Sequence, residues 1–266
     1  MRRLLLPLGI SVLVPASTVF AQRGATGDFH WAKSLPAGQW VRVHNINGNV
    51  SVTGVDGDRV EVVGVRRRGS GDWDGEEVRV DVREGGGGVT ICALWGPDSY
   101  CDEGGMHGEM HGHGPRDRID FEVRLPRRLK LSANSVSGDV RVSGVGDEVR
   151  AHSVSGDVRL DHVRAPSIDA RSVSGDVEAS VDALTGNGDL RFTSVSGNVS
   201  LELPRSLDAD VTLKTVSGEL DSDFPLVIRG PARMGPGRHT VTGTIGRGGR
   251  ELMLTTVSGD VRLRAR

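Results

Sequence analysis

The chain has 266 residues, a formal net charge of −2 at pH 7, 38 glycines and a single tyrosine. Its length is enough for one or two ordinary domains, but so few aromatic residues do not supply the core of a large conventional globule. The slightly acidic balance also argues against nucleic acid as a partner, because nucleic-acid-binding proteins present a basic surface.

Residues 1–21 have the pattern of a signal peptide. Two arginines precede the apolar run 4–14, and a small-x-small cleavage motif ends at Ala21. The run is too short to span a bilayer comfortably, and no second hydrophobic segment follows it. Cleavage would remove two arginines and no acidic residue, which changes the net charge from −2 to −4. We therefore expect an exported protein, periplasmic or secreted to the cell surface, with residues 22–40 as a linker or cap.

Alternating apolar and polar residues begin at Val41 and indicate a strand with one buried face. We expect the repetitive domain to span residues 41–266. The tryptophans all lie in the first hundred residues, at Trp31, Trp40, Trp73 and Trp95. They could form a glycan-binding surface, but cap or core positions explain them more simply.

The two cysteines lie close together in the sequence. Cys92 belongs to an expected strand at 88–94, and Cys101 follows after a turn at 96–98. The even count, the close spacing and an oxidising compartment predict a disulfide between them. Two separate thiols are the alternative, and a redox-active pair fits less well because the spacing is not Cys-x-x-Cys.

The same inserted segment, 92–118, contains the histidine-rich stretch 106–114. His107, His111 and His113, with Met106, Glu109 and Met110, are ligand types that suit copper or zinc. Without a rigid scaffold to fix ligand geometry, we favour a surface loop in which glycine and histidine are soluble filler. We assign no metal and no other cofactor.

One pentapeptide recurs through the rest of the chain. Val-Ser-Gly-Asp-Val stands at 136–140, 154–158, 173–177 and 257–261, with close variants at 195–199 and 216–220 and looser copies at 46–50 and 241–245. The glycines that mark the copies are Gly48, Gly138, Gly156, Gly175, Gly197, Gly218, Gly243 and Gly259. From 138 to 218 the copies lie 18 to 22 residues apart, a period typical of a β-solenoid.

The residues before each copy indicate how the strand runs. Two apolar residues in alternation, such as Leu131 and Ala133, precede a polar pair and then the valine. We expect the polar pair to shift the strand parity by one at a corner or bulge. Val136, Gly138 and Val140 would then face inward, with glycine placed where the coil is too narrow for a side chain.

A hairpin is the competing interpretation of the pentapeptide. A two-residue Gly-Asp turn would place Val136 opposite Arg141, which pairs a core residue with a charge. A three-residue Ser-Gly-Asp loop puts glycine in the middle of the loop, not at its usual last position. We therefore favour coils over hairpins.

These residues resemble the bacterial putative-adhesin family of repeat domains. The resemblance rests on the pentapeptide coils, on the opening Val-x-Asn-x-x-Gly-x-Val-x-Val-x-Gly at 43–54 and on Leu-Pro turns at 125–126 and 203–204. It covers about residues 40–266 and departs from the pattern between about 92 and 118. It implies a right-handed, single-stranded β-helix or closely related β-solenoid outside the cytoplasm, and it carries over no catalytic residues.

Stacked coils would align the residues that follow the glycines, about 4.8 Å apart where rungs are adjacent. This column contains Asp139, Asp157, Asp176, Asn198, Glu219 and Asp260. Calcium could bridge the carboxylates, but the paired glycines of calcium-binding repeats are missing from the sequence. Neighbouring arginines, such as Arg159 placed over Glu178, can neutralise the acids instead. The serines of the repeat are expected to form hydrogen-bonded ladders.

Signatures of common enzymes, such as a Gly-x-Ser-x-Gly elbow or a phosphate-binding glycine loop, are missing from the sequence. We predict a non-catalytic, exported protein of the adhesion or cell-envelope type, which contacts an envelope polymer, a glycan or a protein surface. A carbohydrate-binding or carbohydrate-cleaving β-helix is the first alternative, because glycan-cleaving enzymes use that fold. A metal-responsive envelope protein is the second.

Overall fold

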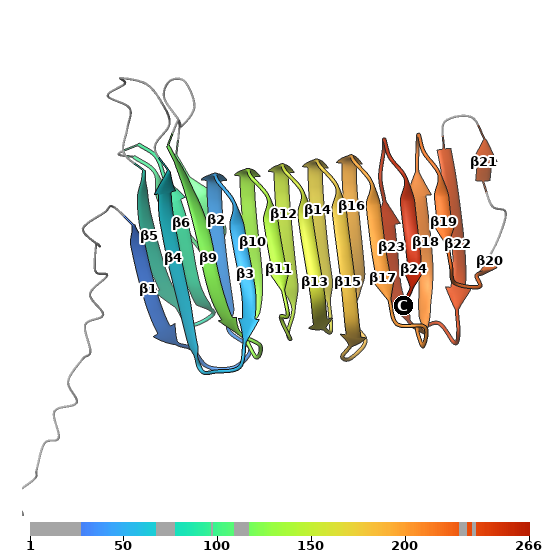
Figure 1. The fold of residues 1–266 in the computed structure, drawn as a ribbon, viewed down its shortest axis with the longest axis horizontal. Helices are drawn as coiled ribbons and strands as arrows, with labels where there is room; N and C mark the ends of the chain where they lie inside the picture. Colours follow the sequence, from blue (N-terminus) through green and yellow to red (C-terminus); the bar gives the residue numbers. More distant parts are fainter. Residues whose placement is uncertain (1–27, 68–77, 97, 109–116, 229–232, 236–237) are drawn as a thin grey trace, which may run out of the picture.

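The computed structural model describes residues 28–67, 78–96, 98–108, 117–228, 233–235 and 238–266. These residues form strands and turns, and they contain no helix with the length and apolarity that crossing a bilayer requires. Two large sheets face each other and both extend along the long axis of the molecule, and the chain winds from one to the other (Figure 1). The described chain is therefore all-β, as its alternating pattern predicts.

Sheet A contains ten strands. In spatial order they are β1 (Phe29–Ser34), β4 (Arg59–Arg67), β9 (Arg118–Pro126), β3 (Val50–Val55), β11 (Val140–Ser143), β13 (Val158–Ala165), β15 (Val177–Leu184), β17 (Val199–Leu203), β24 (Val261–Ala265) and β19 (Leu220–Ser222).

Sheet B contains twelve strands. In spatial order they are β20 (Val227–Ile228), β22 (Arg238–Ile245), β18 (Ala209–Thr215), β23 (Arg250–Thr255), β16 (Leu190–Ser196), β14 (Ile168–Ser174), β12 (Val149–Ser155), β10 (Lys130–Ser137), β2 (Trp40–Asn47), β6 (Gly88–Leu94) and β5 (Arg79–Gly85), with β21 (Arg233–Gly235) paired to β22. A separate hairpin is formed by β7 (Tyr100–Asp102) and β8 (Gly105–His107).

From β10 to β17 the chain alternates strictly between sheet B and sheet A. Each strand from β10 to β15 pairs in parallel with the strand two positions later in the chain. In sheet B, Leu131 lies beside Val149 and Val149 beside Ile168, which are advances of 18 and 19 residues. The next turn, to Leu190, takes 22 residues. Tight hairpins cannot produce parallel pairs, so the chain forms coils and the hairpin interpretation is wrong.

The hydrophobic core fills the space between the two sheets. Every second side chain points inward, such as Leu131 and Ala133 from β10 and Val140 and Val142 from β11, and all four are buried. The side chains between them point to the outer faces, as the period of two in a strand requires. Because valine, alanine and leucine dominate the inner faces, the stack forms a continuous core with very few aromatic residues.

The order of the coils in space differs from their order in the chain. β23 lies between β16 and β18, and β24 lies between β17 and β19. The pentapeptide at 257–261 therefore separates the copies at 195–199 and 216–220. In the same way, β2 lies between β6 and β10 in sheet B. β3 lies between β9 and β11 in sheet A. The variant copy at 216–220 leads into β19, the last strand of sheet A.

Antiparallel strands cover both ends of the stack. At one end β4 pairs with β9, β1 with β4 and β5 with β6, and at the other end β22 pairs with β18. Gly243, which the sequence groups with the corner glycines, lies inside β22 opposite Val211. Its motif is ordinary alternating strand sequence and forms no corner. Charged residues on the outermost strands, including the Lys33–Glu84 ion pair between β1 and β5, disfavour pairing with further strands.

Candidate interaction surfaces

Each pentapeptide except the loose copy at 241–245 forms a corner where the chain leaves sheet B and enters sheet A. At six of these corners the residue just before the pentapeptide is buried, and its hydroxyl donates a hydrogen bond to the glycine carbonyl of the neighbouring coil; at the copy 46–50 the residue is Asn45, which donates to the Ile119 carbonyl. Ser135 donates to Gly48 at 2.9 Å. The same bond is made by Ser153, Ser172, Ser194, Thr256 and Thr215 to Gly138, Gly156, Gly175, Gly197 and Gly259. A buried hydroxyl needs a partner, and here each coil supplies one to the next.

This serine ladder overturns the predicted register of the corner. Ser135 continues the alternation of β10 into the core, so the chain turns one residue later than we expected. Val136 is 41% exposed, whereas Val140 returns to the core. The prediction that the first valine of the pentapeptide faces inward is therefore wrong. The inward position at the corner is occupied by Ser135, whose hydroxyl is hydrogen-bonded, and not by the apolar side chain of Val136.

The corner glycines are required by the backbone of the adjacent coil. At Gly156, where φ is +154°, an added Cβ would lie 2.3 Å from the carbonyl oxygen of Gly138. The same clash recurs at Gly138, Gly175, Gly197, Gly218 and Gly259, and at Gly48 it involves the Ile119 carbonyl. Since the obstructing atom is backbone, no side-chain motion relieves it. The prediction of a narrow interior was wrong, and glycine is needed because neighbouring coils approach each other closely.

The residue after each glycine builds a second ladder. The Asp139 carboxylate accepts the backbone N–H of Asp157 at 2.9 Å, and Asp157 accepts that of Asp176 at the same distance. The series continues through Asn198, Asp260 and Glu219, and it begins with Asn49, which accepts the N–H of Asp139. Because the donor is a backbone amide, asparagine serves as well as aspartate.

Arginines neutralise much of this acidic column. Arg141 donates to Asp139 at 2.7 Å, and Arg262 donates to Asp260 at 2.6 Å. On the neighbouring part of sheet A, Arg159 reaches Glu178 at 2.9 Å, as predicted. The structure thus pairs the acids with backbone amides and guanidinium groups.

The two ladders hold an apolar edge at the surface, which the sequence analysis missed. The first valine of the pentapeptide is 41 to 45% exposed in five successive coils, at Val136, Val154, Val173, Val195 and Val257. We call this column the valine edge. The serine that follows each valine is also exposed. Repetition of large exposed apolar side chains marks a candidate contact surface. Its signal in the sequence is the repeated Val-Ser at a corner that does not need valine for packing.

The outer face of sheet B carries a different surface feature around the half-buried Trp40. Three cationic groups lie over its indole ring: Arg150 at 4.6 Å, Lys130 at 5.5 Å and Arg42 at 5.7 Å from the ring centroid. We call these four residues the basic patch. Glu148 accepts hydrogen bonds from Lys130 at 3.2 Å and Arg150 at 2.8 Å, so two of the three positive charges share one carboxylate.

His44 lies beside the basic patch on β2. Burial, reinforced by the positive charge of Arg42, lowers the pKa of its imidazole from 6.5 to about 4, although Asp102 acts in the opposite direction. His44 is therefore neutral at pH 7 and adds no charge to the patch. The other described tryptophans, Trp31 and Trp95, are buried in the core; Trp73 lies outside the described residues.

A disulfide joins Cys92 to Cys101, with their Cα atoms 6.1 Å apart. It attaches the β7–β8 hairpin to β6, and Leu94 and Met106 pack with it into a small cluster outside the main core. His107 stacks on Tyr100, with ring centroids 4.9 Å apart, and its Nε2 lies 3.0 Å from an oxygen of Asp102.

The remaining positions of the histidine-rich stretch that we considered as ligands, at 109–111 and 113, lie outside the described residues, as does the expected signal peptide. Within the described ranges, no three side chains of His, Cys, Asp or Glu come together as a metal site.

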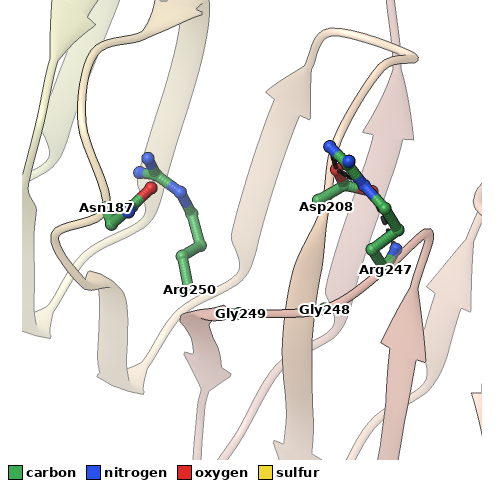
Figure 2. Close-up of a pocket in the computed structure, with 6 residues that line it drawn as sticks. All are labelled: Asn187, Asp208, Arg247, Gly248, Gly249 and Arg250. Carbon is green, nitrogen blue, oxygen red and sulfur yellow. Dashed lines mark hydrogen bonds and ion pairs between the residues drawn. The ribbon is translucent and has the colours of Figure 1, made fainter.

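A pocket of about 440 Å³ opens near the turns at the far end of the stack. Its lining consists of Asn187, Asp208, Arg247, Gly248, Gly249 and Arg250 (Figure 2). Both arginines are engaged: Arg247 pairs with Asp208 at 2.8 Å, and the buried Arg250 donates to the carbonyls of Gly188 at 3.1 Å, Pro166 at 3.3 Å and Gly186. Burial lowers the pKa of Arg250, and Asp189 opposes this effect. Arg247 and Arg250 therefore connect neighbouring turns around the pocket.

Each coil contributes one strand to each of two sheets, and hydrogen-bonded ladders at the corners connect successive coils. This arrangement defines an all-β repeat protein of the solenoid type. The chain belongs to the Toastrack DUF4097 family, whose sequence profile matches residues 9–264. A solved structure described as a putative cell adhesion protein from Clostridium sporogenes superposes with a TM-score of 0.50 at 9% identity, covering 89% of this chain and 99% of that one. A putative adhesin from Bacteroides fragilis is 10% identical, with a TM-score of 0.38 and coverage of 90% and 97%. No protein of curated function matches the sequence. At these identities the likeness concerns the fold alone.

Proposed function

We propose that this protein is a non-catalytic, exported interaction protein of the adhesion or cell-envelope type, which binds extended, repetitive envelope polymers through its stacked coils. The proposal includes the right-handed winding that the family resemblance implies. The observation that carries it is the valine edge, in which the same side chain recurs with an exposed fraction of 41 to 45% in five successive coils.

Repetition suits binding better than catalysis. An active site requires unlike groups that converge on one point, whereas each rung here presents the same valine and serine about 4.8 Å from the next. Covering the exposed part of one valine is worth about 1 kcal/mol, too little for a stable contact by itself. A partner with repeated units makes that contact at every rung, and the combined affinity exceeds that of any single one.

Threonine substitution tests this proposal with little change of shape. Replacing Val154, Val173 and Val195 together by threonine removes the apolar contact and should leave the melting temperature close to that of the parent. Binding to a panel of cell-wall and capsule polymers, measured by biolayer interferometry, should weaken stepwise from the single to the triple variant. Val227→Thr, which makes the same change at an exposed valine of β20 outside the valine edge, is the control.

Two results would contradict the proposal. Binding that is indifferent to all three valines would exclude the valine edge as the contact surface. Cleavage of a glycan that a single carboxylate substitution abolishes would support the carbohydrate-cleaving alternative. The carbohydrate-binding alternative also relies on a repetitive polymer that contacts several coils. The basic patch is the observation that favours it.

A further inference from the structure

The basic patch is less well neutralised than the arginines on the opposite face of the molecule. On sheet A, Arg141 pairs with Asp139, Arg159 with Asp161 and Glu178, and Arg262 with Asp260. On sheet B, Lys130 and Arg150 share Glu148. Arg42 forms no ion pair with any described carboxylate. Its Nη1 atom is buried and has no hydrogen-bond partner among the described residues. Within the patch three positive charges therefore face the one carboxylate of Glu148, while Asp169, in register with Arg150, pairs with Arg171.

The register of three strands arranges this charge around an aromatic ring. Arg42 on β2 and Arg150 on β12 both lie beside Ser132 of the intervening strand β10. The two arginines are thus two rungs apart, about 10 Å along the stack. The guanidinium carbons of Arg150 and Arg42 lie 4.6 Å and 5.7 Å from the centroid of the Trp40 ring. Cations held against an aromatic face lose less freedom when a ligand binds.

We propose that the basic patch binds an acidic polysaccharide of the polyuronate type. This inference rests on the proposed function and names the ligand class of one of its surfaces. Guanidinium groups bind carboxylates with paired hydrogen bonds, and the half-buried Trp40 holds these groups together at the surface. One sugar of an extended chain spans about one rung, so carboxylates on alternate sugars can reach Arg42 and Arg150.

A nucleic acid fits the patch less well. Tight binding to nucleic acid uses many phosphate contacts, whereas the patch offers three cations, two of which already share a carboxylate. The short spacing of the arginines and the single half-buried ring suit a few sugar units.

Polygalacturonate and its fully methyl-esterified form provide a matched pair of probes, because they have the same sugar backbone and esterification removes the charge of the carboxylates. We expect the full chain to bind the acid form, less tightly at 500 mM than at 50 mM salt, and to bind the ester at least tenfold more weakly. Arg42→Gln with Arg150→Gln should lower the affinity for the acid form at least tenfold. Arg141→Gln with Arg159→Gln, on sheet A, removes the same charge and should change it less than twofold.

Each outcome of this experiment is decisive. Equal losses in the two double variants would show a dependence on net charge and exclude the patch, and no binding to polygalacturonate would also overturn the inference. Equal, Arg42-dependent binding of polyphosphate or single-stranded DNA would replace the glycan with a general polyanion. If neutral polymers bind through the valine edge while polygalacturonate does not, the proposed function survives without this inference. If no polymer binds, both fall. Melting temperatures of all variants exclude unfolding as the cause of a loss.

Discussion

The middle of the stack and its N-terminal end are built on different principles. From β10 to β17 each coil repeats the last, and the same serine, glycine and aspartate positions connect it to its neighbours. Around β5 and β6 the repeat is interrupted by antiparallel strands and a disulfide hairpin. The basic patch lies at the border of the two regions, with Trp40 and Arg42 on β2 and Lys130 and Arg150 on β10 and β12. The middle thus gains stability and a regular surface from repetition, whereas side chains found in only one coil gather from its first coils toward the N-terminal end.

Adding one methyl group at a corner should have the largest effect and breaks the regular middle. Gly156→Ala places a Cβ 2.3 Å from a backbone oxygen, whereas Gly243→Ala in the antiparallel β22 leaves 3.0 Å to the nearest atom. We expect the first to lower the free energy of unfolding by about 3 kcal/mol or more and the second by less than about 1 kcal/mol. Urea denaturation of both variants measures the difference. Equal losses would show that the corner is not limited by contact between coils.

The end region should respond to pH through His44. Its pKa of about 4 in the folded protein lies below the ordinary value of 6.5, so the unfolded chain binds more protons between these values. The contribution of His44 to the free energy of unfolding is therefore fully present above pH 6.5. It decreases as the pH falls toward 4, by at most about 3 kcal/mol. His44→Gln should flatten this part of the stability profile, measured by denaturation at successive pH values. A slope that is the same in the variant would assign the pH dependence to other groups.

The same contrast separates what could be predicted from sequence from what could not. Alternation and period were enough for the coils, and the pairing of Arg159 with Glu178 followed from them. The inward Ser135 was missed because its partner, the Gly48 carbonyl, is 87 residues away in the chain. The position of the last coil depends on which neighbour it packs against, and copies with the same local sequence do not reveal this. The basic patch was missed for a similar reason, since Trp40, Lys130 and Arg150 meet only through the register of β2, β10 and β12.

The smallest expected effect concerns the aspartate ladder and sharpens the account of the regular middle. Asp157 accepts the backbone N–H of Asp176 through one carboxylate oxygen, and Asn198 accepts that of Asp260 through an amide oxygen in the same position. Asp157→Asn should therefore change the free energy of unfolding by less than about 0.5 kcal/mol, whereas Asp157→Ala removes the acceptor and should cost about 1 kcal/mol. If the column were held together by a bound cation, the asparagine variant would lose about as much stability as the alanine variant, and a chelator would lower the melting temperature of the parent. Thermal unfolding of the three proteins with and without chelator distinguishes the two cases. If Asp157→Asn leaves the stability unchanged, the ladder needs an oxygen acceptor at each rung and does not need the negative charge of the aspartate.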